Sequence, residues 1–274
     1  MDVSAAIAAF ISELEEGLGT VFLYRHFDRT IMLHSETANI AIAIYLAGNT
    51  GRIPLSNIRT FHIDQDQIIR DRSKLLSRLF SLLGKGQVVY ARQTVVARID
   101  KRIASAFLEE HHLQVTISGK YRYGLYHNGE LMSVAIFSGG RRMLKKHEGY
   151  RSFELLRFCH KGGYRVVGGL SKLLKSFIAD FHPNDIMTYV DRDWAQDSNL
   201  RTLGFEEQGH TAPHTFWVTA AGRQAIRDAA HQRQVQETFP SGYLLHNLGS
   251  TKLVLSISET QAMNSSRDPE AKTK

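Results

Sequence analysis

The residues that could do chemistry gather in one stretch of the chain, residues 153–205. Within it, Gly168 and Gly169 are followed closely by Ser171 and Lys172. If the two glycines join a strand to a helix, the first N–H groups of that helix converge on one point and favour an anion there. The serine hydroxyl and the lysine ammonium would add to the attraction. The pattern predicts a site for a phosphate-bearing ligand, with a plain tight turn as the simpler alternative.

Three further side chains could surround the reacting atoms beside this turn. Tyr189 and Asp191 are two residues apart in a run typical of a strand, so they share one face, while Glu154 belongs to an earlier strand. A tyrosine can protonate a leaving thiolate, and a carboxylate can accept the proton of an attacking amine. The competing interpretations are a salt bridge or a solvated face for Glu154, expected on the face opposite Arg157, and a helix cap for Asp191.

An excess of basic residues predicts a polyanionic partner. The 274-residue chain carries a formal net charge of +7 at pH 7, and its isoelectric point is near 9.5. This favours nucleic acid, with DNA as the first choice, over acidic proteins. The side chains predicted to contact phosphates, or to stack on a base in the case of the tryptophan, are Arg141, Arg142, Lys145, Lys146, Arg157, Arg192 and Trp194. A solvated loop for the first four and a core position for the tryptophan are the alternatives.

Composition excludes several other kinds of protein. Cys159 is the single cysteine, which excludes an internal disulfide and a cysteine-clustered zinc site and favours the reducing cytoplasm. The histidines match no metal-binding spacing, so we expect no metal. No apolar run approaches the ~20 residues that a membrane helix needs, and residues 1–10 do not have the pattern of a signal peptide. We expect a cytoplasmic protein that does not bind a membrane.

Hydrophobic periodicity and turn residues predict an α/β protein with two domains and a tail. The first domain, residues 1–86, would hold a helix at 3–16, strands at 21–24, 30–33, 40–46 and 58–63, and a helix at 67–83. The second domain, residues 87–257, would begin with a strand at 88–96, a helix at 101–111, a hairpin of 121–127 with 130–137, and a basic loop at 138–149. After the stretch at 153–205 would come a strand at 215–219, a polar helix at 223–236 and a strand pair within 244–257. Residues 258–274 are polar and predicted to be disordered.

The order of strand, hairpin, strand, glycine turn, helix and strand, ending on Leu-Gly-Phe at 203–205, resembles the fold of the Gcn5-related N-acetyltransferases. The run RVVGGL at 165–170 matches the first four positions of that family's signature, Arg/Gln-x-x-Gly-x-Gly/Ala, and has Leu170 where a small residue is usual. The resemblance implies a mixed central sheet flanked by helices. It also implies an acyl-coenzyme A whose pyrophosphate would lie on the four turn residues named above.

A second resemblance is to phage and mobile-element proteins that often carry a homing-type endonuclease domain at the N-terminus. The stretches that carry it are 89–92 with 107–114, 153–159 with 166–173, and 189–192 with Trp194 and 203–205. The central block is also similar to the phage Mom group, acetyltransferase-like enzymes that modify adenine in DNA. Residues 1–86 resemble a degenerate PD-(D/E)xK nuclease. Because Ala43 stands where a metal-binding carboxylate belongs, we expect this small α/β domain not to cleave DNA.

These observations together predict an acyltransferase-like enzyme of phage or mobile-element origin. Its acceptor would be a DNA base or another nucleic-acid-associated amine, and its donor a phosphate-bearing acyl compound. Two alternatives stay open, a non-catalytic DNA-binding accessory derived from a homing-type endonuclease and an N-acetyltransferase of small amines. Nothing in the chain predicts a particular oligomeric state.

Overall fold

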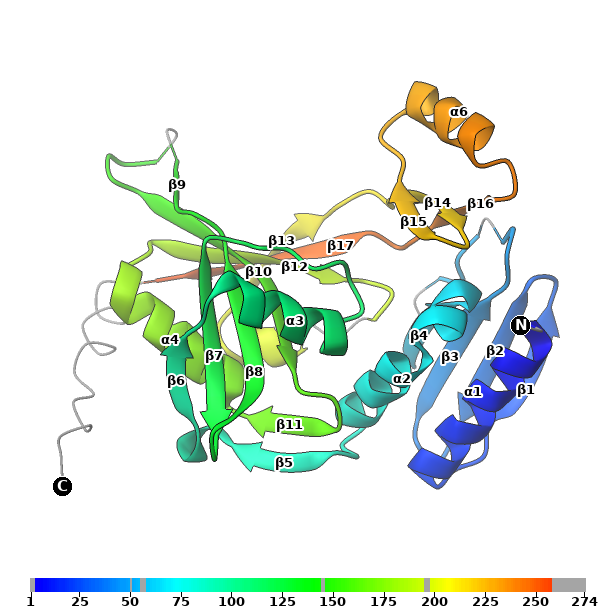
Figure 1. The fold of residues 1–274 in the computed structure, drawn as a ribbon, viewed down its shortest axis with the longest axis horizontal. Helices are drawn as coiled ribbons and strands as arrows, with labels where there is room; N and C mark the ends of the chain where they lie inside the picture. The colour runs from blue at the N-terminus through cyan, green and yellow to red at the C-terminus, as the bar shows by residue number, and fades with distance from the viewer. Residues whose placement is uncertain (1–2, 50, 55–57, 144–145, 195–197, 258–274) are drawn as a thin grey trace. The chain divides into compact units, whose positions relative to one another are not determined.

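The computed structural model describes residues 3–49, 51–54, 58–143, 146–194 and 198–257, and Figure 1 labels their helices and strands. The chain forms two compact units, each made of separate pieces of sequence. Unit 1 comprises Met1–Leu76, Val190–Asp197 and Gly209–Thr251, and unit 2 comprises Ser77–Tyr189, Ser198–Gln208 and Lys252–Lys274. The tail predicted at 258–274 lies outside the described residues.

This division differs from the predicted domains 1–86 and 87–257. Residues 209–251, which the sequence placed in the second domain, are counted with the N-terminal segment. Within unit 1, Arg223 binds Asp64 and Asp66, which lie 159 and 157 residues away along the chain. Local sequence pattern carries no information on contacts between residues so far apart along the chain.

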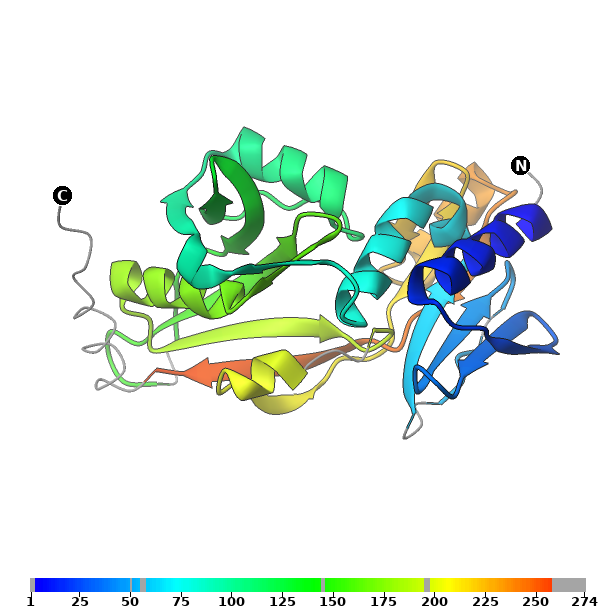
Figure 2. The same ribbon diagram turned by 90° about the horizontal axis from the view of Figure 1, so that it is seen from below.

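The N-terminal part of unit 1 is a mixed sheet with helices on one face (Figure 2). Its strands, in spatial order, are β1 (Leu23–Phe27), β2 (Thr30–Ser35), β3 (Ile40–Tyr45) and β4 (Arg59–Asp64). β3 runs antiparallel to β2 and parallel to β4. The helices are α1 (Val3–Leu18) and α2 (Gln65–Leu82), and α2 passes into unit 2 after Leu76. Every residue of β3 is buried, as its continuous apolar run predicts, whereas every residue of the edge strand β1 is exposed.

A small antiparallel sheet completes unit 1. Its order is β15-β14-β16, with β14 (Thr215–Thr219), β15 (Gly222–Ala225) and β16 (Tyr243–His246). The helix predicted at 223–236 is wrong in its first part, because the chain turns back at Gly222, whose φ of 138° favours glycine, and continues as β15. The helix α6 (Ala229–Thr238) begins only after Asp228, whose carboxylate accepts the N–H of His231 at 2.8 Å and caps it.

Unit 2 is built on a mixed sheet, which confirms the predicted fold class of a mixed central sheet flanked by helices. The spatial order is β13-β17-β12-β10-β8-β7-β6, with β9 paired to β10. The strand bounds are β6 (Val95–Arg98), β7 (Tyr121–His127), β8 (Glu130–Phe137), β9 (Arg141–Arg142), β10 (Arg151–His160), β12 (Asp185–Asp191), β13 (Glu206–His210) and β17 (Ser250–Ser256). β10 is antiparallel to β8 and parallel to β12. The ends of β12, β13 and β17 are counted with unit 1.

Helices lie on both faces of the unit 2 sheet. The helix α3 (Lys101–His111) packs Phe107 into a cluster with Ile136 of β8. The helix α4 (Gly169–Phe181) stacks Phe177 on Phe137, with ring centroids 3.9 Å apart. Because residues 136 and 137 are neighbours in one strand, their side chains point to opposite faces, and so the two helices cover opposite faces. A short helix, α5 (Ser198–Thr202), follows β12.

A separate parallel pair of strands belongs to unit 2. It consists of β5 (Gln87–Tyr90) and β11 (Tyr164–Val167). The 3-10 helix η1 (Ala91–Gln93) interrupts the strand predicted at 88–96 and separates β5 from β6. β9 falls inside the loop predicted at 138–149. In the part of the chain that the structure describes, no helix is long and apolar enough to cross a membrane.

Candidate functional site

The central sheet of unit 2 opens between β10 and β12. These parallel strands pair only where Ser152, Phe153 and Glu154 face Asp185, Ile186 and Met187. β10 then continues to His160, and β12 also runs on, without pairing to each other. At the parting point the Thr188 hydroxyl donates to the Leu155 carbonyl at 2.9 Å. Backbone groups beyond this point on the two facing edges are therefore not used by a strand ladder between β10 and β12.

A bulge in β10 coincides with this opening. The register against β8 shifts between Leu155, opposite Phe137, and Arg157, opposite Ile136. One extra residue, Leu156, is thereby inserted, and such an insertion bends the strand. The insertion also puts Glu154 and Arg157 on the same face. The prediction that they point to opposite faces is wrong, because simple alternation does not count the inserted residue.

The helix α4 begins at the same end of the sheet. It connects the parallel strands β10 and β12, so its N-terminus lies at the carboxyl ends of both, where the sheet opens. Gly168 is its N-cap with φ 76° and ψ 4°, a left-handed conformation that favours glycine, and no side chain caps the helix. A Cβ on Gly169 would lie 3.1 Å from Val166 and 3.2 Å from Leu125. Gly168 thus starts α4 without a capping side chain, and Gly169 packs its backbone closely against Val166 and Leu125.

Lys172 and Ser171, the other two residues predicted to bind the ligand, lie in the first turn of α4. Lys172 donates through Nζ to the Ala91 carbonyl at 2.9 Å and to the Thr94 carbonyl, and burial lowers the pKa of this ammonium. Two of its three N–H donors are therefore used by carbonyls at 91 and 94, and its contact with an anion stays a prediction. Ser171 lies half-buried in the first turn of α4.

Two of the three predicted catalytic residues come together on one face of unit 2. Glu154 is opposite Met187 in the parallel register, and Tyr189 follows two residues later, so the three share a face. The Glu154 side chain is half-buried, with a carboxylate oxygen 4.0 Å from Nη2 of Arg141. Tyr189 is 44% exposed. A carboxylate and a phenol thus lie on the same side of the opening, one from each of its edges.

Two predicted residues lie instead in unit 1. The Asp191 carboxylate accepts the N–H of Asp193 at 3.0 Å and holds a turn at 192–194, where the capping interpretation expected a helix. Trp194 is buried, with its ring centroid 5.7 Å from that of Phe61. A core role, the alternative to base stacking, describes its position.

The cationic residues predicted to bind nucleic acid fall into two sets. Arg141, Arg142 and Lys146 are exposed on the β9 hairpin of unit 2, and Lys145 lies outside the described residues. Arg157 donates instead to the Leu156 and Val115 carbonyls. Its burial lowers its pKa, and the Glu154 carboxylate opposes that shift. In unit 1, Arg192 donates to the Leu248 carbonyl at 3.0 Å. The hairpin cations remain available to a polyanion.

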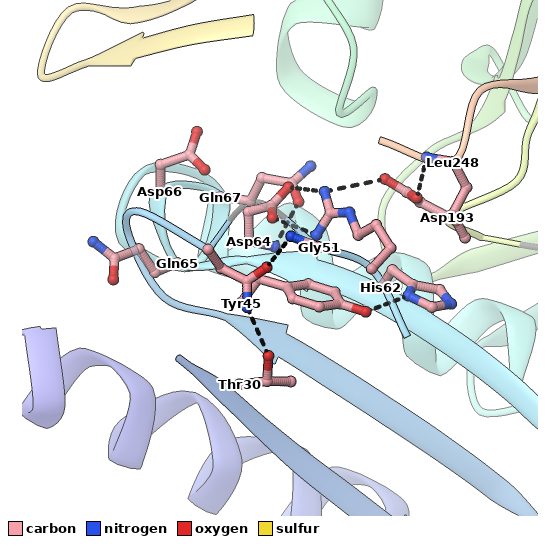
Figure 3. Close-up of polar contacts among 12 residues, drawn as sticks. Thr30, Tyr45, Gly51, His62, Asp64, Gln65, Asp66, Gln67, Asp193 and Leu248 are labelled. Carbon is pink, nitrogen blue, oxygen red and sulfur yellow. Dashed lines mark hydrogen bonds and ion pairs between the residues drawn. The ribbon is translucent and has the colours of Figure 1, made fainter. Parts of the chain in front are cut away.

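The sequence interpretation missed a buried ionic cluster in unit 1, part of which Figure 3 shows. Arg52 binds both carboxylate oxygens of Asp64 at 2.6 and 2.9 Å and lies 3.5 Å from Asp193. Arg223 binds Asp66 at 2.7 Å through two nitrogens and Asp64 at 2.9 Å. The visible sign was an Asp-x-Asp whose first residue, Asp64, ends a buried strand, but its partners are remote in sequence.

In this cluster the negative charges of the aspartates are neutralised by the positive charges of the arginines. Its carboxylates hold guanidinium groups, and within the described residues no group of three or more His, Cys, Asp or Glu is arranged to hold a metal. Burial raises the pKa of Asp193 to about 7, and the Arg52 charge opposes that rise. Tyr45 accepts the N–H of Ile53 and contacts His62 at 2.8 Å in the same cluster. The cluster therefore consists of buried charges that are paired with one another inside unit 1.

Comparisons with known proteins add a likeness of structure. No protein-family profile matches the chain, and no curated protein matches it. Among solved structures it is similar to one described as histone acetyltransferase HPA2 and related acetyltransferase, from Corynebacterium glutamicum (12% identity, 61% of this chain and 99% of that one, TM-score 0.38). It is also similar to the ribosomal-protein-S18-alanine N-acetyltransferase from Escherichia coli (14%, 60% and 94%, 0.37). A third is an acetyltransferase from Bacillus subtilis in complex with CoA (12%, 60% and 99%, 0.37). All three are acetyltransferases, but TM-scores below 0.5 do not by themselves assign a family or a function.

Proposed function

We propose that unit 2 is an acyltransferase that uses an acyl-coenzyme A. The observation that carries this proposal is the opening of the sheet between β10 and β12 at the end where the uncapped helix α4 begins. An extended thioester arm fits such an opening, because it can hydrogen-bond to strand edges that pair with no other strand there. Its diphosphate would then meet the first N–H groups of α4. No side chain caps those N–H groups in the structure.

The side chains at the opening suit proton transfer in acyl transfer. When bound, an acyl-coenzyme A supplies a thioester, at which an amine forms a C–N bond while the C–S bond breaks. Glu154 would accept the proton of the attacking amine, and Tyr189 would donate a proton to the departing sulfur. The Arg141 guanidinium lies 4.0 Å from the Glu154 carboxylate, beside the position proposed for the attacking amine. Asp191 holds its own turn and has no part in this scheme.

The acceptor we propose is an amine on a nucleic acid, with a DNA base as the first candidate. Support comes from the exposed cations of the β9 hairpin. Arg141 pairs in register with Ser152, two residues before Glu154, so phosphate contacts there would bring a base near the carboxylate. The residue stretches shared with phage and mobile-element proteins are the ground for proposing such an origin.

A second candidate function is a DNA-binding accessory without catalysis. The observation that favours it is the engagement of Lys172 by two carbonyls, which uses two of the three N–H donors of the cation predicted to bind the donor. An acetyltransferase of small amines would have no use for the exposed hairpin cations. Salt-sensitive DNA binding without donor binding would support the accessory.

The test is calorimetric binding of acetyl-coenzyme A to the wild type, Gly169→Glu and Lys175→Glu. A Cβ at 169 would lie 3.1 Å from Val166 and 3.2 Å from Leu125, so Glu there crowds the start of α4, whereas Lys175 is exposed further along the same helix. We expect binding at roughly micromolar Kd for the wild type and the Lys175 variant, and at least tenfold weaker binding for the Gly169 variant. Circular dichroism would show that both variants fold. Absence of binding to the wild type would overturn the proposal.

A further inference from the structure

One face of the small β5–β11 sheet is exposed although it is rich in apolar side chains. In the register of this parallel pair, Val88 lies beside Arg165 and Tyr90 lies beside Val167. The intervening residues Val89 and Val166 point the other way and are buried. Val88, Tyr90 and Val167 are 43%, 47% and 41% exposed. We call Val88, Tyr90, Arg165 and Val167 the β5–β11 face. Parallel sheets are normally covered on both faces, so this one has the character of a binding surface.

Two guanidinium groups accompany the exposed ring. Arg165 belongs to the face and is exposed, and Arg92 follows β5 directly, with its guanidinium carbon 5.0 Å from the centroid of the Tyr90 ring. Within the described residues, neither arginine forms an ion pair with a carboxylate. An aromatic ring suits a nucleobase, since every base has a flat face that can stack. Free guanidinium groups suit a phosphate, which they bind with two parallel hydrogen bonds.

The face is held next to the start of α4. β11 leads straight into Gly168, the N-cap of that helix, and β5 and β11 lie side by side (Figure 1). The two hydrogen bonds from Lys172 tie the Ala91 and Thr94 carbonyls to the first turn of α4. A Cβ on Gly168 would be 3.5 Å from the Ala91 side chain. The Tyr90 ring and Arg92 are therefore fixed beside the point where the donor's diphosphate is proposed to bind.

We propose that the β5–β11 face, with Arg92, binds the nucleotide end of the acyl donor. Tyr90 stacks on the base, Val88 and Val167 contact its edge and the sugar, and Arg92 and Arg165 bind the phosphate on the ribose. This rests on the proposed function and deepens it, because it assigns a surface and named residues to the nucleotide of that donor. The donor is a thioester attached to a purine nucleotide, rather than one attached to a short pantetheine arm or to a carrier protein.

The experiment compares three probes on four proteins by calorimetry. The probes are acetyl-coenzyme A, S-acetyl-pantetheine, which lacks the nucleotide, and adenosine 3′,5′-bisphosphate, which lacks the thioester. The proteins are the wild type, Tyr90→Ala, Arg92→Gln and the control Arg102→Gln, which removes an exposed arginine from α3. We expect the first two variants to weaken both nucleotide probes about tenfold, as loss of one base stack or one phosphate contact does. Their affinity for S-acetyl-pantetheine should match that of the wild type, and Arg102→Gln should change nothing.

The outcomes separate this inference from the proposed function. If the wild type binds acetyl-coenzyme A and both variants bind it equally well, the β5–β11 face is not the nucleotide site, while the proposed function stands. If the wild type binds no acetyl-coenzyme A but binds the bisphosphate in a manner that needs Tyr90, the nucleotide site stands and the donor assignment fails. If the variants lose affinity for a single-stranded oligonucleotide and keep that for acetyl-coenzyme A, the face serves nucleic acid and the inference is overturned.

Discussion

At the scale of the residue, unit 1 depends on charge placed inside it. Arg52 has only 6% of its side chain exposed and shares its guanidinium between Asp64 and Asp193. Desolvating such groups costs several kcal/mol per ion, and the cost is offset only while every partner is present. Removing one partner from the cluster should therefore be strongly destabilising.

Replacing Arg52 by Gln should lower the free energy of unfolding by about 3–5 kcal/mol, because it leaves buried carboxylates without their cation. The matched control is Arg72→Gln, which breaks an exposed ion pair with Glu13 at 3.4 Å and should cost less than about 1 kcal/mol. Urea denaturation followed by circular dichroism measures both. If both substitutions lower the free energy of unfolding equally, the buried ion pairs of Arg52 contribute no more to stability than an exposed ion pair does.

Asp193 should give stability a dependence on pH that its amide variant lacks. Its folded pKa of about 7 exceeds the value of about 3.9 in an unfolded chain. Between these values the folded chain keeps a proton that the unfolded chain has released, so this group makes folding less favourable as the pH rises from about 4 to about 7.

The variant Asp193→Asn cannot ionise, so its unfolding free energy relative to the wild type should increase as the pH rises from 5 to 8. The contributions of the buried His62 and His160, whose pKa values burial lowers to about 4, are common to both proteins and cancel. Denaturation at the two pH values gives the difference. A difference that is the same at both would rule out titration of Asp193 in this range.

At the scale of the element, local signals predicted what local interactions decide. The helix at 101–111 and the hairpin of 121–127 with 130–137 have the predicted bounds, because Asp100 caps the helix and Asn128-Gly129 forms the turn. The bulge at Leu156 and the tie from Lys172 to η1 were not predictable, since each depends on a partner that only the folded chain provides. The glycine turn lies where it was predicted. The hydrogen bonds of the neighbouring Lys172 to the Ala91 and Thr94 carbonyls were not predicted.

Lys172→Met should loosen the segment from Tyr90 to Thr94 without unfolding α4. The substitution keeps a long side chain but removes both hydrogen bonds to the η1 carbonyls. Hydrogen exchange read by mass spectrometry should be at least tenfold faster in that segment, while Lys175→Met, on an exposed position of the same helix, leaves it unchanged. Because the β5–β11 face ends in this segment, acetyl-coenzyme A should also bind more weakly. Unchanged hydrogen exchange in the Lys172 variant would show that these two hydrogen bonds do not hold the segment from Tyr90 to Thr94 in place.

At the scale of the whole molecule, two units are made from alternating pieces of one chain. Unit 1 takes residues from before and after the main body of unit 2. Sequence pattern alone predicts consecutive domains. It identifies helices and strands, but it does not show that the strands at 215–246 belong to the same unit as those at 23–64. The ion pairs of Arg223 with Asp64 and Asp66 show what was missing.

A fragment of residues 1–86, the domain that the sequence predicted, should therefore not fold by itself. It lacks Arg223 and Asp193, and it leaves Asp64 and Asp66 buried with fewer cations than in the full chain. Circular dichroism and amide NMR of the fragment test this. A cooperative thermal transition with dispersed amide signals would show that residues 1–86 form an independent domain after all.

The order of strands also constrains how the protein is made by a ribosome. β17 lies between β12 and β13 in the sheet although it is the last strand in the sequence. Until residue 256 has been synthesised, β12 and β13 each expose an edge that only β17 will cover, and unit 1 is unfinished until residue 251. Open edges on a growing chain invite wrong pairing. The nascent protein should thus depend on slow translation or on chaperones, and its yield in a cell should rise as growth temperature falls.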